Sequence, residues 1–413
     1  MDLKKSGHQK IDWVKKYMKV INSIKEKYYD EKPFKGKKIS MSIHLEAKTA
    51  YLAIILKQLG AEVSITGSNP LSTQPDVVEA LKDYGLNVYA EKTLDEGVYW
   101  KNIDKVLSQK PDIIIDDGAD LGSRYIEKYD TNSLLGICEE TTTGVMRYEA
   151  LNKKGSLKVP VIAVNNSKMK YLFDNRYGTG QSTWDGIIRS TNTTVTGKNV
   201  VVGGYGWCSR GIALRAKGLG ANVIVTEVDP IKANEAIMDG FRVMKMDYAA
   251  PIGDIFVTAT GDINIITKKH FRKMKDGAIL ANSGHFDVEV SVKDMKEIAD
   301  SIEEIKPGVE EYKIDGKSLF LLAKGRLVNL VNGDGHPIEI MDLSFSLQLE
   351  AAKYLLENPD QKINVKPVPD FIDNKIARIK LETMGIEIDT LSKEQQKYLN
   401  KGIWFCLSIN LML

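Results

Sequence analysis

A short apolar run that ends in glycines constrains the fold of this chain more than any other feature. Residues 199–203 read Asn-Val-Val-Val-Gly, which predicts a buried strand, and the residues after them predict a tight turn and a helix. Gly204 and Gly206 would let the backbone approach a pyrophosphate, which the free N–H groups of the helix start would bind. Glu227 ends the next predicted strand about 20 residues further on, where a carboxylate holds a ribose 2′-hydroxyl. The pattern predicts a dinucleotide-binding unit and favours NAD over NADP.

Ser209 stands where this kind of motif has its third glycine. That glycine normally allows close packing of helix against strand, so Ser209 leaves the closeness of the packing, and with it the affinity for the cofactor, in question. A strand–helix–strand crossover that binds no nucleotide is the alternative interpretation of the motif by itself.

Composition and length limit the classes of protein to which the chain can belong. Its 413 residues are more than a domain with a single hydrophobic core usually contains, so we expect two or three domains. The 57 basic and 55 acidic residues leave a formal charge of +2, which gives no indication of a nucleic-acid or membrane partner. Residues 1–20 lack the apolar core of a signal peptide, and the apolar tail 402–413 is too short to span a bilayer. We expect a cytoplasmic protein with no metal site, in which Cys138, Cys208 and Cys406 are structural thiols.

The first half of the chain predicts a sheet of its own. Residues 11–30 have a helical period with a lysine-rich outer face, which predicts one amphipathic helix. From 38 to about 165 strands alternate with helices, so we expect a mostly parallel α/β sheet. Ligands bind beyond the carboxyl ends of such strands. We expect a substrate site there because polar residues lie at those ends, namely His44, Asn69, Gln74 and Asp117.

The second half predicts the dinucleotide sheet and a hinge. Strands are expected near residues 199, 222, 255, 279 and 319, and the strand that ends before Thr260 would flank the nicotinamide. The glycine-rich segment 325–337 suits a hinge back to the first sheet. Lys170 and Asp174 are four residues apart and would share one helix face, with a solvated ion pair as the alternative. The remaining helices are expected at 339–357, 371–384 and 392–400.

Seven motifs, in order along the chain, resemble those of S-adenosylhomocysteine hydrolases, and the resemblance covers about residues 5 to 400. They are His44; Ser72-Thr73-Gln74; Asp116-Asp117-Gly118; Glu139-Glu140-Thr141-Thr142-Thr143-Gly144; Phe173-Asp174-Asn175; Gly284-His285-Phe286-Asp287; and Gly325-Arg326-Leu327-Val328-Asn329-Leu330.

The resemblance implies an architecture and an assembly. The fold would be α/β, with two doubly wound Rossmann-like domains joined by a hinge and a small helical C-terminal segment. Residues 1–181, completed by about 336–370, would form the substrate-binding domain, 182–335 the NAD domain, and 371–413 the C-terminal segment. The family is a homotetramer that holds one NAD tightly in each subunit, and its partner is a small nucleoside thioether.

The resemblance also implies a reaction. A thioether at the nucleoside 5′ carbon is a poor leaving group, and oxidation of the 3′-hydroxyl by NAD supplies a ketone that acidifies the 4′ hydrogen. Homocysteine is then eliminated, water adds, and the ketone is reduced again, so no net redox change remains.

By motif position the resemblance implies a role for each site residue. The catalytic residues would be Lys170 and Asp174 at the 3′-hydroxyl, Asp117 at the 4′ carbon, His44 and His285 at the leaving thiol and the water, and Glu140, which orients the ribose. The substrate would also contact Glu46, Lys48, Thr49, Gln74, Asn165, His336 over the base, and Met341. The cofactor would contact Thr141, Thr142, Thr143, Asn175, Gly204, Gly206, Glu227, Thr260, Asn282 and Asn329.

Glu46 and Lys48 differ from the residues that many family members have at these positions, which face the adenine edge. A lysine is only a donor, so it matches a 6-oxo group and mismatches a 6-amino group, while Glu46 would accept the N1–H of hypoxanthine. The pair therefore favours S-inosylhomocysteine, as in some archaeal methanogens, over S-adenosylhomocysteine. In the alternative, Glu46 and Lys48 pair with each other and tolerate adenine.

Two other functions compete with this one. A simple NAD-dependent 2-hydroxy-acid dehydrogenase would satisfy the glycine motif alone and would release reduced cofactor. A regulatory relative without activity would have lost its acid–base residues, yet all of them are present: His44, Asp117, Lys170, Asp174 and His285.

Overall fold

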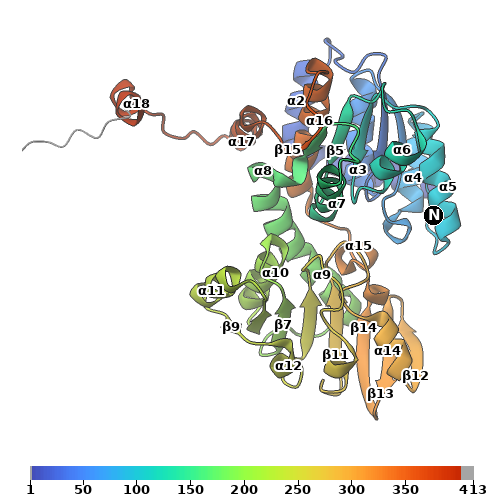
Figure 1. Ribbon diagram of the computed structural model, residues 1–413, viewed down its shortest axis with the longest axis vertical. Coiled ribbons are helices and arrows are strands. Elements are labelled where there is room, and N and C mark those ends of the chain that lie inside the picture. Colours follow the sequence, from blue (N-terminus) through green and yellow to red (C-terminus); the bar gives the residue numbers. More distant parts are fainter. Residues whose placement is uncertain (1, 401–413) are drawn as a thin grey trace, which may run out of the picture.

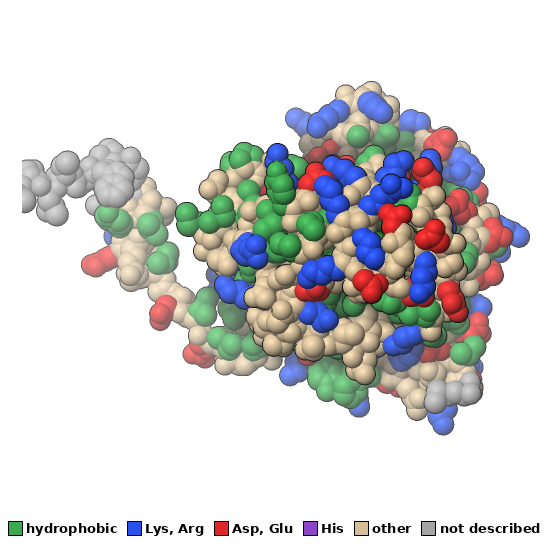
Figure 2. Space-filling view, turned by 90° about the horizontal axis from the view of Figure 1, so that it is seen from below, with side chains coloured by type: hydrophobic (Ala, Val, Ile, Leu, Met, Phe, Trp, Pro, Cys, Tyr) green, Lys and Arg blue, Asp and Glu red, His purple; other side chains and the backbone are tan. Residues whose placement is uncertain are grey.

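The computed structural model describes residues 2–400, whose strands form two sheets, one of seven and one of eight strands. The sheets lie one above the other along the long axis, each with helices on its faces (Figure 1). On the face of the molecule shown in Figure 2, basic and acidic side chains are interspersed. No helix among the described residues is both long and apolar enough to cross a membrane.

The first sheet is parallel throughout and has the order β15-β6-β5-β4-β1-β2-β3. The chain order reverses between β1 and β4, and such a switch point is where doubly wound sheets bind ligands. Its strands are β1 (Lys38–Ser42), β2 (Glu62–Thr66), β3 (Asn87–Val88), β4 (Ile113–Asp116), β5 (Gly136–Glu139), β6 (Val161–Ala163) and β15 (Val365–Pro367). Its helices are α3 (Ala47–Gln58), α4 (Pro75–Asp83), α5 (Glu96–Leu107), α6 (Asp120–Lys128) and α7 (Thr142–Lys153).

The second sheet repeats this topology and adds an antiparallel pair at one edge, in the order β12-β13-β14-β11-β10-β7-β8-β9. Its switch point lies between β7 and β10, at the predicted glycine turn. Its strands are β7 (Asn199–Gly203), β8 (Asn222–Thr226), β9 (Arg242–Val243), β10 (Ile255–Thr258), β11 (Ala278–Asn282), β12 (Ser301–Lys306), β13 (Val309–Ile314) and β14 (Lys317–Leu322). Its helices are α10 (Trp207–Gly218), α11 (Pro230–Met238), α12 (Met246–Ala249), α13 (Lys268–Phe271) and α14 (Val292–Ile298). The predicted pair of doubly wound α/β sheets is confirmed.

Two connections join the sheets. The first consists of α8 (Lys168–Lys170), a π-helix over Tyr171–Gly178, and α9 (Thr179–Thr191). The domain boundary expected between residues 181 and 182 therefore falls inside α9. The second is α15 (Val328–Val331) and the segment that leads to α16 (Ile338–Glu357). The long helix α16 packs back on the first sheet, where its apolar side chains enter the core. Residues near 170–180 and 328–345 therefore lie between the two sheets.

Some predicted elements differ in the structure. The single helix expected over 11–30 is wrong, because α1 (Leu3–Tyr17) and α2 (Lys19–Tyr28) are separated at Met18. The break lets buried Asp342 accept hydrogen bonds from the N–H groups of Val20 and Ile21 at 2.8 and 2.9 Å, which caps α2. Five strands were not predicted: β5, β9, β12, β13 and β15. Beyond α17 (Asp370–Thr383), the chain to α18 (Lys393–Asn400) extends away from the body in Figure 1, and Cys406 and the tail 402–413 lie outside the described residues.

Candidate active site

A cavity of about 510 Å³ lies between the carboxyl ends of the two sheets. Most predicted site residues line it, including His44, Glu46, Lys48, Thr49, Asp117, Glu140, Thr141, Thr142, Thr143, Lys170, Asp174, Asn175, Gly206, Thr260, His285, Asn329, His336 and Met341. Gln74, Asn165, Gly204, Glu227 and Asn282 are not among its lining residues.

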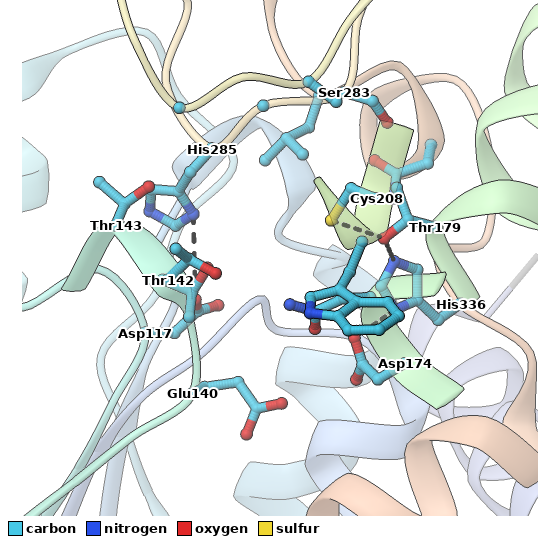
Figure 3. Close-up of a pocket in the computed structure, with 18 of the residues that line it drawn as sticks. Asp117, Glu140, Thr142, Thr143, Asp174, Thr179, Cys208, Ser283, His285 and His336 are labelled. Atoms are coloured by element: carbon cyan, nitrogen blue, oxygen red, sulfur yellow. Dashed lines mark hydrogen bonds and ion pairs between the residues drawn. The ribbon is translucent and has the colours of Figure 1, made fainter. Parts of the chain in front are cut away.

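Asp117 lies between the imidazoles of His44 and His285 in this cavity, and Figure 3 shows the side with His285. Its Oδ2 is 3.6 Å from His44 Nε2, and its Oδ1 is 3.9 Å from His285 Nδ1. Gly118 lets His285 approach, because a Cβ there would lie 2.4 Å from His285 Nε2. Burial lowers the pKa of His44 to about 4, so this imidazole is neutral near pH 7 and able to accept a proton. The cluster can remove a hydrogen from carbon and exchange protons with a leaving group or a water.

The same three side chains have ligand atoms within 4.8 Å of one another, a spacing that a metal ion would also accept. The expectation of no metal stays a prediction.

Lys170 is buried against two carboxylates. Its Nζ lies 3.1 Å from Asp174 Oδ1 and 3.5 Å from Glu140 Oε1, and it donates to Asn175 Oδ1 at 2.8 Å. The π-helix that begins at Tyr171 brings the residues four and five places after the lysine to the same ammonium. Burial lowers the pKa of Lys170, but Asp174 and Glu140 outweigh it and hold this pKa above its usual value. The alternative of a solvated ion pair is wrong, since Lys170 is only 5% exposed.

Glu140 offers a free acceptor to the cavity. Its Oε2 accepts a hydrogen bond from Gln348 at 2.6 Å, while its buried Oε1 has no hydrogen-bond partner among the described residues. Burial raises the pKa of Glu140 to about 7. Asn165 lies behind this group, where its Oδ1 accepts a hydrogen bond from Asn175 at 3.1 Å. Asn165 therefore orients a neighbour of Lys170 without lining the cavity.

The glycine turn after β7 has the geometry of a pyrophosphate site. Gly204 has φ +87°, and no atom lies within 4 Å of a Cβ built on Gly206, which caps α10. Ser209 does not separate helix from strand, because its hydroxyl lies within hydrogen-bonding distance of the carbonyls of Gly203 (3.2 Å) and Ala259 (2.9 Å). Glu227 Oε2 accepts a hydrogen bond from Tyr205 N at 2.7 Å and thereby holds the turn.

Asn329 and Asn282 differ in what they offer to a cofactor. Asn329 lines the cavity, and its Oδ1 is buried without a hydrogen-bond partner in the described part of the chain, so it is ready to accept from an amide such as that of nicotinamide. Asn282 instead hydrogen-bonds to the backbone of Gly284, Phe286 and Gly325, and so holds the loop that carries His285. The open glycine turn and the free oxygen of Asn329 fit NAD.

Glu46 and Lys48 form a buried ion pair at the cavity wall, with Nζ 2.7 Å from Glu46 Oε2. Glu46 also caps α3 by accepting from the N–H groups of Lys48 and Thr49 at 3.0 and 3.2 Å. Lys48 donates a second hydrogen bond, at 2.9 Å, to the carbonyl of Asp334 in the segment between the sheets. The mutual pairing that was the alternative expectation is therefore present.

Comparisons with known proteins agree with this geometry. The model of the S-adenosyl-L-homocysteine hydrolase family matches residues 1–133, and the model of the NAD-binding domain of that hydrolase matches residues 175–335. An adenosylhomocysteinase of Thermotoga maritima is 59% identical over 95% of this chain and 98% of its own length. The chain belongs to the S-adenosyl-L-homocysteine hydrolase family. It is a hydrolase of thioethers, and it binds NAD.

Two further similarities extend the comparison. An S-inosyl-L-homocysteine hydrolase of Methanocaldococcus jannaschii is 54% identical over 97% of this chain and 97% of its own length. One component of the dipicolinate synthase of Bacillus halodurans superposes with a TM-score of 0.50 at 15% identity, over 78% of this chain and 99% of that one. This second similarity concerns the fold alone.

In this hydrolase several predicted residues have other neighbours than expected. His336 lines the cavity, and its Nδ1 lies 3.1 Å from Asp174 Oδ1, a contact that was not predicted, while its place over the base stays a prediction. Gln74 accepts a hydrogen bond from Lys10 of α1 at 2.9 Å. Sequence reasoning missed five residues at or behind the site: Glu139, Thr179, Cys208, Ser344 and Gln348. Ser344 and Gln348 could have been found, because they are polar residues one turn apart in the mainly apolar middle of α16, residues 343–352, where a buried polar side chain needs a partner.

Proposed function

We propose that this hydrolase cleaves S-inosyl-L-homocysteine to inosine and L-homocysteine. The observation that carries this proposal is the ammonium of Lys48 at the cavity wall. It has three N–H donors and no acceptor, and Glu46 and the Asp334 carbonyl take two of them. The third N–H matches the 6-oxo group of hypoxanthine and mismatches the 6-amino group of adenine. The similarity to the S-inosyl-L-homocysteine hydrolase supports the same substrate.

The second candidate substrate is S-adenosyl-L-homocysteine. The observation that favours it is the close pairing of Glu46 with Lys48, which offsets the positive charge that a 6-amino group would face. The Thermotoga relative named adenosylhomocysteinase agrees with this candidate. The two substrates differ only at the base, so the chemistry at the ribose is the same for both.

In the proposal, each subunit would hold one tightly bound NAD at the glycine turn and Asn329, and the cofactor would supply reversible hydride transfer at the 3′ carbon. Lys170 first passes its ammonium proton to one of the two carboxylates that face it, Asp174 or Glu140, and then takes the proton of the 3′-hydroxyl, with Asn175 fixing its position. The free Oε1 of Glu140 accepts from a ribose hydroxyl. Asp117 removes the 4′ hydrogen as a proton and later delivers to the same carbon a proton that has exchanged with water, and His44 and His285, on either side, transfer protons to the departing thiol and from the incoming water.

The cofactor side of the proposal follows the second sheet. Gly204 and Gly206 form the pyrophosphate turn, and Glu227 fixes that turn while it offers its carboxylate to the ribose. The threonines Thr141–Thr143, which start α7, reach the cofactor from the first sheet. We assign 1–181 with about 336–370 to the substrate domain, 182–335 to the NAD domain and 371–413 to a C-terminal segment. The remaining elements of the proposal are a cytoplasmic homotetramer and a small-molecule partner only.

The test compares homocysteine release from the inosyl and adenosyl thioethers by the wild type and Lys48→Met. The wild type is expected to prefer the inosyl thioether in kcat/KM by about tenfold or more, because a buried donor left without an acceptor costs on the order of 1–3 kcal/mol. Lys48→Met removes the donor and is expected to abolish this preference. Lys101→Met, an exposed lysine of α5, is the matched control and should keep it. Equal rates on both thioethers in the wild type would contradict the inosyl proposal and favour the adenosyl one.

A further inference from the structure

A chain of polar contacts leads from the start of the NAD-binding helix to Lys170. Cys208, at the start of α10, lies 3.6 Å from the hydroxyl of Thr179, the first residue of α9. The same hydroxyl is 3.2 Å from His336 Nε2, and His336 Nδ1 is 3.1 Å from Asp174 Oδ1. Figure 3 shows these side chains following one another along a bent path from Cys208 through Thr179 and His336 to Asp174.

The donors and acceptors of this chain fit one arrangement. Asp174 is ionised, because Lys170 and His336 hold its pKa below its usual value although burial opposes them. An ionised carboxylate only accepts, so His336 Nδ1 carries a proton and donates it to Asp174. A neutral imidazole then has Nε2 as its acceptor, and the Thr179 hydroxyl, which has one proton, donates it to Nε2 and accepts from the thiol of Cys208. Thr179 therefore selects the tautomer in which His336 can donate to Asp174.

The backbone at Gly178 leaves room for the imidazole of His336. A Cβ on Gly178 would lie 2.9 Å from His336 Nδ1, so the glycine at the end of the π-helix makes room for the imidazole. Thr179 is 4% exposed, and Ser344 donates to the other oxygen of Asp174 at 2.6 Å. The carboxylate of Asp174 is therefore held by His336 and Ser344 as well as by Lys170.

We propose that Thr179 and His336 are positioning residues for the proton transfer at Lys170. Together they hold Asp174 in place. His336 donates to the same Oδ1 that faces the ammonium of Lys170, which weakens the attraction between this carboxylate and the lysine proton. Lys170 can then pass that proton to Glu140, whose Oε1 lies 3.5 Å from Nζ, and regain it within one turnover. Cys208 lies in the first turn of α10, next to the glycine turn, so its contact with Thr179 also connects that turn to Lys170. This inference rests on the proposed role of Lys170 at the 3′-hydroxyl.

The experiment measures the oxidation step alone. Holoenzyme with bound NAD is mixed with inosine or adenosine, and the absorbance of reduced nicotinamide is followed in time. Thr179→Val removes the hydroxyl at nearly constant shape and is expected to slow cofactor reduction about tenfold or more, with little change in the nucleoside concentration at half-saturation. Thr179→Ser restores the hydroxyl and is expected to restore the rate. Thr191→Val, near the other end of the same helix, is the control and should react as the wild type does.

Gly178→Ala gives an independent arm, because its methyl group displaces His336 while Thr179 stays intact. It is expected to slow the same step, and it decides the question if Thr179→Val fails to fold. A wild-type rate in the folded Thr179→Val or Gly178→Ala variant, or a failure of Thr179→Ser to recover, would overturn the inference. If the wild-type holoenzyme reduces no cofactor with either nucleoside, the proposed function itself fails, which is a different outcome.

Discussion

Glu139 accepts a hydrogen bond at 2.9 Å from the backbone N–H of Gly118, the residue directly after Asp117. The same buried carboxylate accepts from the N–H groups of Ala119 at 3.1 Å and Thr141 at 2.9 Å. Gly144 gives it space, since a Cβ there would lie 2.2 Å from the carboxyl carbon of Glu139. One side chain thus holds both the loop of Asp117 and the loop of the proposed cofactor threonines.

Glu139→Gln is expected to lower kcat about tenfold to a hundredfold. Oε1 accepts from Gly118 and Thr141 and Oε2 from Ala119, so the NH₂ group of the amide would face a backbone N–H in either orientation, and the loop of Asp117 loses at least one of its hydrogen bonds. The measurement is the rate of homocysteine release together with the melting temperature. Glu149→Gln, on the exposed side of α7, is the matched control. A normal kcat in folded Glu139→Gln would show that the loops hold without this anchor.

Ser209→Ala is expected to weaken the retention of NAD. Without the hydroxyl, the carbonyls of Gly203 and Ala259 lose a donor at the turn between β7 and α10, which costs on the order of 1–2 kcal/mol. The measurement is the rate at which NAD dissociates from the holoenzyme. Ser209→Gly, which supplies the third glycine of the usual motif, separates the effect of the lost hydrogen bonds from that of helix packing. Wild-type retention in Ser209→Ala would contradict this account of the serine.

The sequence predicted much of this site because its main residues lie at strand ends. His44 and Asp117 follow β1 and β4, which flank the switch point of the first sheet, and the glycine turn follows β7 in the second. The π-helix that brings Asn175 to Lys170 has no pattern in the sequence, because its hydrogen bonds depend on packing between the sheets. The bond from His336 to Asp174 joins residues far apart in the chain, which periodicity cannot predict. Met18 likewise lies in a continuous helical pattern, and only the distant cap at Asp342 explains the break.

Asp342 provides a prediction for the dependence of stability on pH. Burial raises the pKa of its carboxyl to about 6, although two backbone N–H groups oppose the shift. Because the folded pKa lies above the unfolded value of about 4, the contribution to stability is complete below about pH 4 and is lost as the pH rises through about 6. The difference in unfolding free energy between wild type and Asp342→Asn should therefore fall by roughly 2–3 kcal/mol from about pH 4 to pH 7.

Urea unfolding at a series of pH values measures this difference. Asp360→Asn, an exposed carboxylate just beyond α16, is the control and should show a nearly constant difference over the same range. A constant difference for Asp342→Asn as well would show that the carboxyl titrates alike in the folded and unfolded chain.

The central claim is that Asp117, between His44 and His285, removes the 4′ hydrogen of a substrate oxidised at its 3′ carbon. The most direct measurement is hydrolysis in deuterated water, with the nucleoside product analysed for deuterium at the 4′ carbon. The account predicts deuterium at that carbon, equal amounts of nucleoside and homocysteine, and a cofactor that ends oxidised. Asp117→Asn should lose homocysteine release and exchange together. Release of homocysteine at the normal rate with no deuterium at the 4′ carbon would contradict the account.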